Sequence, residues 1–152
     1  MATRRPADAA SASARTMSAS VGDADASAWN NLGNVLLLQT RYSEAEPAYA
    51  RAMALAPNFS FAAANRAAAL YQLGRDADAA REWRRLLRRF PTFDDARAGL
   101  AASLWAAGDR AAAEGELSRV DDPRYKSPAW LADERRWPPR LVGAAAALLA
   151  VK

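Results

Sequence analysis

Two pairs of neighbouring aspartates, Asp94-Asp95 and Asp121-Asp122, are the first candidates for chemistry, because paired carboxylates can serve as general acid and base. The 152-residue chain offers them no usual partner, since it contains no His and no Cys. Those absences exclude a Ser–His–Asp triad, a thiolate nucleophile and the commonest zinc sites. Each pair also stands at a predicted helix start or just after a helix end, where capping explains a carboxylate. We therefore expect no catalytic residue, no metal site, no cofactor and no enzyme.

Five arginines form the strongest charge pattern, at the spacing i, i+3, i+4, i+7, i+8. On a helix this spacing places all five on one face, which we expect to be an outer one. A solvated face balanced by nearby acids is the simpler interpretation, and docking to anionic lipid or an acidic partner is the alternative. Nucleic acid is not expected, because no aromatic residues alternate with the arginines there. This basic stripe comprises Arg81, Arg84, Arg85, Arg88 and Arg89.

The elements that carry these residues recur along the chain with a period of about 34 residues. Gly108 follows Gly74 by one such period, and Thr40 precedes Gly74 by another. Large residues recur at some positions and small residues at others over the same spacing. The aligned sets are Leu36, Leu70 and Leu104; Ala45, Ala79 and Ala113; Tyr49, Trp83 and Leu117; Ala52, Leu86 and Val120; and Pro57 with Pro91. Each copy has helical apolar periodicity on both sides of a break, which predicts two helices.

The residues at the breaks predict where helices begin and end. Gly74 and Gly108 suit left-handed C-terminal caps, and Asp109 suits the start of the helix that follows. Ser43 and Glu46 have the spacing of a capping box. Because Ala and Arg are abundant and both favour helices, the composition predicts an all-α fold.

The first copy resembles a tetratricopeptide (TPR) repeat. The matching residues are Trp29-Asn-Asn-Leu32-Gly33, Leu36, Ala45, Tyr49, Ala52 and Pro57. The segment 65–75 resembles a common second TPR repeat, and the third copy is more degenerate. The resemblance covers roughly residues 26–127. It implies an all-α, right-handed TPR superhelix of three helix-turn-helix pairs with a C-terminal covering helix.

The resemblance also implies a non-enzymatic scaffold or adaptor that holds an extended peptide or a partner helix in a concave groove. In chaperone-binding TPR domains, Asn at the registers of Asn34 and Asn65 helps to clamp a C-terminal carboxylate. This chain has Asn30, Asp95 and Gly99 where that clamp has cations, so we expect a neutral or basic segment and not an acidic chaperone tail. Alternatively, Asn34 and Asn65 only tie neighbouring helices together. The groove-lining residues would be Asn30, Asn31, Asn34, Phe61, Asn65, Tyr71, Gln72, Asp95 and Trp105.

By composition the chain divides into a tail (1–22), the repeats (23–122) and a C-terminal capping segment (123–152). The tail has three basic residues, one acidic residue and no aromatic residue, which predicts a disordered or targeting segment. The repeats have 12 basic and 14 acidic residues, and the C-terminal segment has six basic and two acidic residues. The sequence pI of about 10.0 therefore comes from the flanks and does not point to nucleic acid.

The C-terminal segment is expected to contain further helices. Ser127-Pro128 would begin one, Trp130 and Trp137 would share its face and dock on the third copy, and Pro138-Pro139 would end it. The apolar run 141–151 would reach about 16 Å as a helix, against about 30 Å for a bilayer core, so it cannot span a membrane. It is expected to cover the open end of the repeats, or alternatively to associate peripherally with a membrane.

The stretch 122–139 resembles an ending found in TPR proteins of cyanobacteria and plastids. Some TPR proteins of that lineage assist photosystem assembly at the thylakoid. The resemblance therefore implies an alternative function, a photosystem assembly factor acting at the thylakoid membrane surface. It also implies a plastid or thylakoid location, with the cytoplasm as the alternative.

Overall fold

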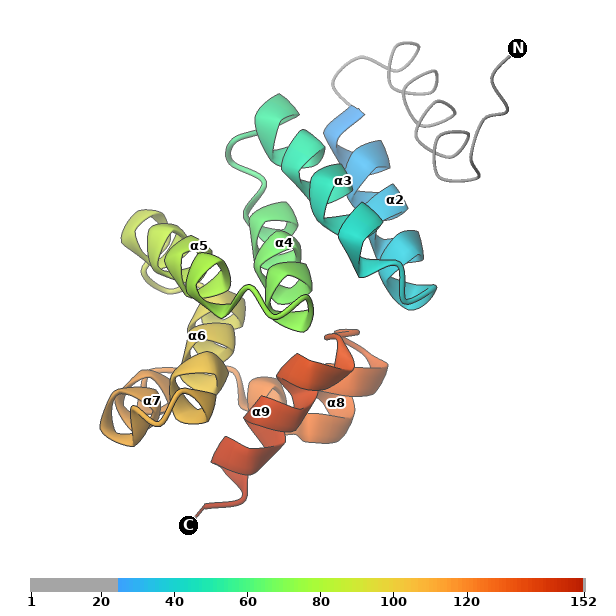
Figure 1. Cartoon of the computed structure of the whole chain (residues 1–152). Coiled ribbons are helices and arrows are strands. Elements are labelled where there is room, and N and C mark those ends of the chain that lie inside the picture. The colour runs from blue at the N-terminus through green and yellow to red at the C-terminus, as the bar shows by residue number, and fades with distance from the viewer. Residues whose placement is uncertain (1–24, 152) are drawn as a thin grey trace, which may run out of the picture. The chain divides into compact units, whose positions relative to one another are not determined.

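The computed structural model describes residues 25–151, and these contain helices and no strand (Figure 1). The predicted all-α fold is confirmed, with the helices of the three copies in the predicted order. The proposed tail or targeting segment lies outside the described residues. The elements are α2 (Asp25–Leu38), α3 (Tyr42–Leu55), α4 (Ser60–Gln72), α5 (Asp76–Arg89), α6 (Asp94–Ala106), α7 (Arg110–Ser118), the 3₁₀ helix η2 (Pro123–Lys126), α8 (Pro128–Asp133) and α9 (Pro139–Leu149).

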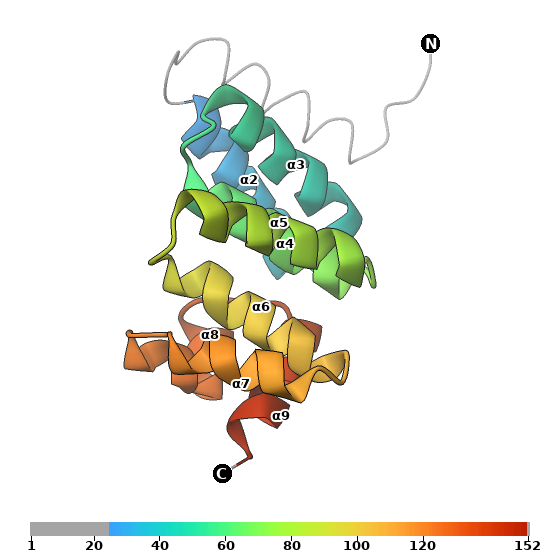
Figure 2. The same ribbon diagram turned by 90° about the vertical axis from the view of Figure 1, so that its left-hand side faces the viewer.

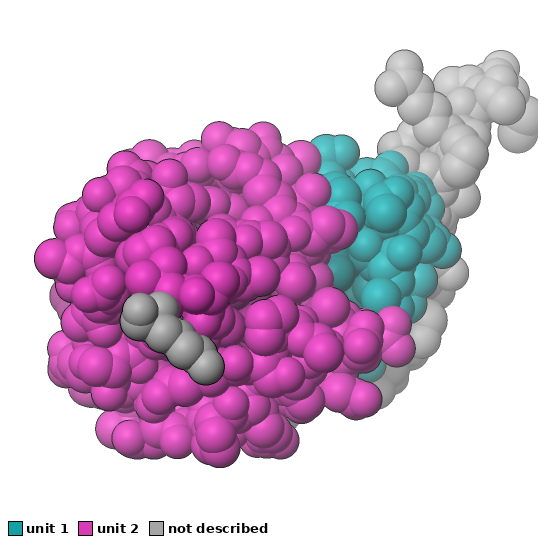
Figure 3. Space-filling view, turned by 90° about the horizontal axis from the view of Figure 1, so that it is seen from below, with its two compact units in different colours: residues 1–66 teal, residues 67–152 magenta. Residues whose placement is uncertain are grey.

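The chain divides into two compact units, Met1–Arg66 and Ala67–Lys152 (Figure 3). In the first unit, α2 and α3 pack side by side as an antiparallel pair (Figures 1 and 2). In the second unit, α6 is central and packs against α5, α7 and α9. Among the described residues, no helix is both long and apolar enough to cross a bilayer.

The turn between the two helices of each copy has the same hydrogen-bonded geometry. Thr40, Gly74 and Gly108 have φ angles of 59°, 80° and 91°. These angles lie in the left-handed region that glycine tolerates best. In each turn, the amide of the next residue donates to the carbonyl of an aligned leucine, as in a Schellman motif. These bonds run from Arg41 to Leu36 (2.8 Å), from Arg75 to Leu70 (2.9 Å) and from Asp109 to Leu104 (3.0 Å). The regular spacing in the sequence therefore corresponds to a repeated helix-ending structure.

The capping predictions are correct at one helix and wrong at another. Asp109 caps α7, since its side chain accepts a hydrogen bond from the amide of Ala112. Ser43 and Glu46 form no capping box, because α3 already begins at Tyr42 and Arg41 occupies the N-cap position. Ser43 therefore lies within the first turn, where its hydroxyl cannot take the N-cap role.

Small residues let the helices approach closely in both units. The aligned alanines Ala45, Ala79 and Ala113 are fully buried. A Cβ at Gly33 would lie 2.5 Å from the Tyr49 ring, and a Cβ at Gly99 would lie 2.6 Å from the Trp83 ring. Tyr49 thus fills space within its own helix pair, whereas Trp83 of α5 reaches the next helix, α6.

The C-terminal segment follows a different path from the predicted one. Ser127 caps α8 as predicted, but α8 ends at Asp133. The chain then turns through Arg136, whose φ is 63°, and Pro139 begins α9 instead of ending a helix. Trp130 consequently lies in α8 and Trp137 in the loop between α8 and α9, so the two do not share a helix face.

Candidate functional site

The two units divide the predicted groove residues between them. Asn30, Asn31, Asn34, Phe61 and Asn65 belong to the first unit. Those of the second unit are Tyr71, Gln72, Asp95 and Trp105. The two sets have different surroundings.

In the first unit, three asparagines and a tyrosine form a hydrogen-bonded cluster. The Asn65 amide nitrogen donates to the side-chain oxygens of Asn30 (3.1 Å) and Asn34 (3.4 Å). The Tyr49 hydroxyl also donates to the Asn34 oxygen, at 2.9 Å. Asn30 and Asn65 are buried, so their amides connect α2 to α4. Their contacts match the alternative interpretation, in which these asparagines tie helices together.

Asn34 differs from the other two asparagines because its side chain is exposed. The side-chain oxygen of Asn34 accepts hydrogen bonds from Tyr49 and Asn65. Its NH₂ group is therefore the part of the side chain that faces solvent. Tyr49 can reach this position because Gly33 has no side chain in its way. The cluster therefore fixes an exposed hydrogen-bond donor on the surface of α2.

Exposed apolar side chains accompany this donor along α2. Val35 and Leu38 are 50% and 56% exposed, although both are large and apolar. Together with Asn31 and Asn34 they have the spacing i, i+3, i+4, i+7, so the four residues share one face of the helix. We call these four residues the open strip: Asn31, Asn34, Val35 and Leu38. Phe61, at the start of α4, is also exposed.

A hollow on the other side of α2 was not anticipated from the sequence. Its volume is about 400 Å³, and α2 and α3 form its walls. Pro47, which lies inside the continuous helix α3, is one of the residues that line the hollow. The lining residues are Trp29, Leu32, Leu36, Glu44, Pro47, Ala48 and Arg51.

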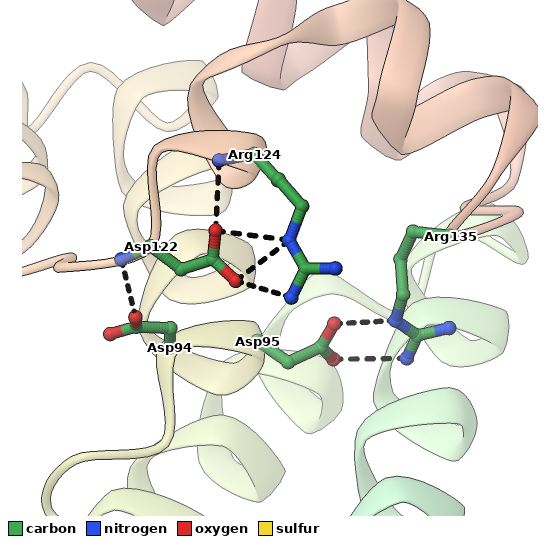
Figure 4. A network of polar contacts seen from close by, with 5 residues as sticks. All are labelled: Asp94, Asp95, Asp122, Arg124 and Arg135. Atoms are coloured by element: carbon green, nitrogen blue, oxygen red, sulfur yellow. Dashed lines mark hydrogen bonds and ion pairs between the residues drawn. The ribbon is translucent and has the colours of Figure 1, made fainter.

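In the second unit, the predicted groove residue Asp95 is buried and bound within the chain. The Arg135 guanidinium holds both carboxylate oxygens, with Nε–Oδ1 and Nη2–Oδ2 distances of 2.5 and 3.0 Å (Figure 4). Asp95 is only 1% exposed. Burial raises the pKa of the adjacent Tyr125 phenol, and the negative charge of Asp95 raises it further. The carboxylate is therefore engaged and does not line an open surface.

Arg140, at the start of α9, makes a second set of contacts with the predicted groove residues. Its backbone amide donates to the Gln72 side-chain oxygen (2.8 Å), and its guanidinium donates to the Tyr71 carbonyl (2.6 Å). The same guanidinium lies 4.2 Å from the centroid of the Tyr71 ring and pairs with Asp76 at 2.5 and 2.9 Å. Burial raises the pKa of Tyr71, while Arg140 opposes that rise.

The apolar side of α9 also packs against predicted groove residues of the second unit. Leu141 and Leu148 are buried, and Leu148 packs with Ala101 and Ala113. Trp105 packs at the edge of that cluster, with the Arg110 guanidinium 4.7 Å from the ring centroid. We expected an open groove at these residues, whereas in the second unit the C-terminal segment lies on them. Of the apolar run offered for membrane contact, Ala144 and Ala145 are also buried, whereas Val151 is 52% exposed.

Three of the four paired aspartates, Asp94, Asp95 and Asp122, have structural partners within the second unit. Asp94 accepts a hydrogen bond from the Asp122 amide at 2.8 Å (Figure 4). Asp122 caps η2 and binds the Arg124 guanidinium, and the hydrogen bond from Arg124 lowers the pKa of the Asp122 carboxyl. Among the described residues, no group of three or more acids is placed to hold a metal ion.

The basic stripe is exposed along α5. Arg81, Arg84, Arg85, Arg88 and Arg89 all lie on the surface. Arg81 pairs with Asp78 at 2.9 Å, and Asp78 also binds Arg75 at 2.9 Å, which lowers the pKa of Asp78. Like charges three or four residues apart destabilise a helix by about 0.2–0.5 kcal/mol per pair. The stripe contains several such pairs, so α5 is less stable than a helix with mixed charges would be.

Comparisons with known proteins agree with this architecture. Residues 26–59, which contain α2 and α3, match the family model of the tetratricopeptide repeat. The fold is similar to that of the TPR2B domain of yeast Sti1, solved in complex with pHsp70, with 21% sequence identity and a TM-score of 0.61. That match covers 80% of this chain and 96% of the Sti1 domain. No curated protein matches the sequence. Residues 26–59 thus resemble a TPR repeat, and the described part of the chain has the all-α fold of a TPR domain, as predicted.

Proposed function

We propose that the chain is a non-enzymatic protein-interaction module whose open strip binds an extended segment of a partner protein. The observation that carries the proposal is the fixed NH₂ group of Asn34 beside exposed Val35 and Leu38. An extended peptide offers backbone carbonyls to such a donor and apolar side chains to its neighbours. The solved complex of the yeast TPR2B domain supports a protein partner for this type of fold.

The chemistry of the open strip favours a neutral or basic partner segment. None of its four residues is cationic, so a terminal carboxylate would gain no ion pair from the strip itself. In the second unit, Asp95, at a position where the chaperone clamp has a cation, is held by Arg135. We therefore keep the proposal that an acidic chaperone tail is not the ligand.

A membrane surface is the less favoured partner. Interfacial binding by α9 would need its apolar side chains. Four of these, Leu141, Ala144, Ala145 and Leu148, are buried. A role as an assembly factor at the thylakoid surface would then depend on basic side chains and on the few apolar side chains of the run that stay accessible, such as Val151. We place the protein-binding role first for this reason.

Selection of peptides from a random library on the purified chain, followed by affinity measurement by fluorescence anisotropy, tests the proposal. We expect Asn34→Ala and Leu38→Ser each to weaken binding about tenfold, the effect of losing one hydrogen bond or apolar contact. Leu73→Ser is the matched control, because Leu73 is an exposed leucine of the second unit. Selected peptides that bind the parent and both strip variants equally would contradict the proposal.

A further inference from the structure

The basic stripe of α5 is not used by the proposed function and lies in the other unit. Arg81 shares Asp78 with Arg75. Among the described residues, Arg84, Arg85 and Arg88 form no ion pair. Their helix therefore presents positive charge that the second unit leaves uncompensated. We propose that this stripe is a second interaction surface, which binds an acidic α-helix of a partner protein.

The spacing of the arginines suits a helical partner. Arg81, Arg84 with Arg85, and Arg88 with Arg89 occupy successive turns, which are about 5.4 Å apart along the axis. A second helix with acidic residues at i, i+4 and i+7 has the same repeat. Guanidinium groups bind carboxylates in bidentate geometry, so such a helix running beside α5 could pair at each turn.

The surroundings of the stripe disfavour a lipid surface. Interfacial helices insert an apolar face between lipids. Two large apolar residues of α5, Trp83 and Leu86, are instead buried, and the third, Leu87, is half-buried. The exposed side chains of the helix are mainly those of the five arginines.

Single-stranded nucleic acid is also a poor match for the stripe. Binding of single strands relies on exposed aromatic rings on which bases stack. Phe90 follows the stripe, but it is half-buried and the Arg89 guanidinium lies 5.5 Å from its ring centroid. A protein helix with regularly spaced carboxylates makes fuller use of the arginines than either alternative.

Fluorescence anisotropy with a labelled, hydrocarbon-stapled helix bearing Glu at i, i+4 and i+7 tests this proposal. We expect saturable binding that weakens as salt is added, because exposed ion pairs are screened. The double variant Arg84→Gln/Arg88→Gln should bind about five- to tenfold more weakly than the parent. The control Arg51→Gln/Arg119→Gln removes two other exposed arginines and should bind as the parent does. Circular dichroism melting should show that both double variants remain folded.

Four outcomes would overturn the proposal. The first is absence of binding to the acidic helix, and the second is binding that the two double variants share equally. The third is tighter binding of a single-stranded RNA oligonucleotide, and the fourth is co-flotation with anionic vesicles, where either depends on Arg84 and Arg88. Asn34→Ala and Leu38→Ser should leave the acidic helix bound, so failure of the open strip and failure of the basic stripe can be distinguished.

Discussion

The two units carry TPR-like helices of the same kind but present them differently. In the first unit, α2 exposes Asn34, Val35 and Leu38. In the second unit, Tyr71 and Asp95 are buried, and Arg140 and Arg135 donate hydrogen bonds to them. The repeat register assigns these two residues to a groove as well. Asp95 lies one 34-residue period after Phe61, yet Phe61 is exposed whereas Asp95 is buried and held by Arg135. Equivalent repeat positions are therefore not equivalent surfaces, because the segment that follows the repeats covers one of these two and not the other.

Removing the Arg135 guanidinium should produce the largest effect, because it leaves the buried Asp95 carboxylate without its cationic partner. We expect Arg135→Ala to lower the free energy of unfolding by about 3–5 kcal/mol, measured by chemical denaturation. The double variant Asp95→Asn/Arg135→Gln should lose much less, since it removes both charges. A single variant as stable as the parent would show that the C-terminal segment does not seal this surface.

Adding a methyl group at the tight glycines should have the next largest effect, and it should be similar in both units. Gly33→Ala and Gly99→Ala each place a Cβ against an aromatic ring. We expect a loss of about 1–3 kcal/mol in thermal or chemical unfolding from such overpacking. Gly115→Ala is the control, because nothing lies within 4 Å of its added Cβ. It should gain about 0.5–1 kcal/mol from helix propensity. A loss of stability in only one of the two variants would contradict the expectation that both glycines are packed equally tightly.

Removing the Tyr49 hydroxyl should have a smaller effect on stability and a specific effect on the open strip. Tyr49→Phe deletes one hydrogen-bond donor to Asn34. We expect the free energy of unfolding to fall by about 1 kcal/mol in chemical denaturation. Asn34 would then be less firmly oriented, and the selected peptides should bind more weakly. Unchanged affinity would show that the orientation of Asn34 does not matter for binding.

The smallest effect is one that appears only at alkaline pH, and it concerns the covered surface of the second unit. Burial raises the pKa of Tyr125 in the folded chain. The unfolded chain releases this proton above its ordinary pKa of about 10, while the folded chain retains it, so stability must fall as pH rises beyond that point. Tyr125→Phe should flatten this fall in unfolding experiments run across alkaline pH. If the free energy of unfolding fell equally steeply with pH in parent and variant, the raised pKa of Tyr125 would be contradicted.

The sequence predicted the features that depend on local or regularly repeated residues. Gly74 and Gly108 end helices as expected, and Asp109 caps the next helix. Even Thr40, which lacks the glycine signal, adopts the left-handed conformation that its position in the repeat predicts. These features follow from hydrogen bonds within a single turn of chain.

Other features could not be predicted from such patterns. The spacing of Trp130 and Trp137 suggested a shared helix face, yet Arg136 turns the chain between them. Both rings nevertheless contact Tyr125, with centroids 5.0 and 6.3 Å away. A seven-residue spacing signals a shared face only while the helix continues, and that depends on packing partners elsewhere in the chain.

The sequence by itself thus determined the helices of the repeats, the left-handed turns within them and the small–large pairing of their contacts, because each depends on nearby residues or on the regular repeat. Only the tertiary structure decided which surfaces remain open. The ion pairs Arg135–Asp95 and Arg140–Asp76 join residues that are 40 and 64 positions apart. No periodicity links such residues, since their attraction acts only after the intervening helices have packed and brought them within a few ångströms of one another.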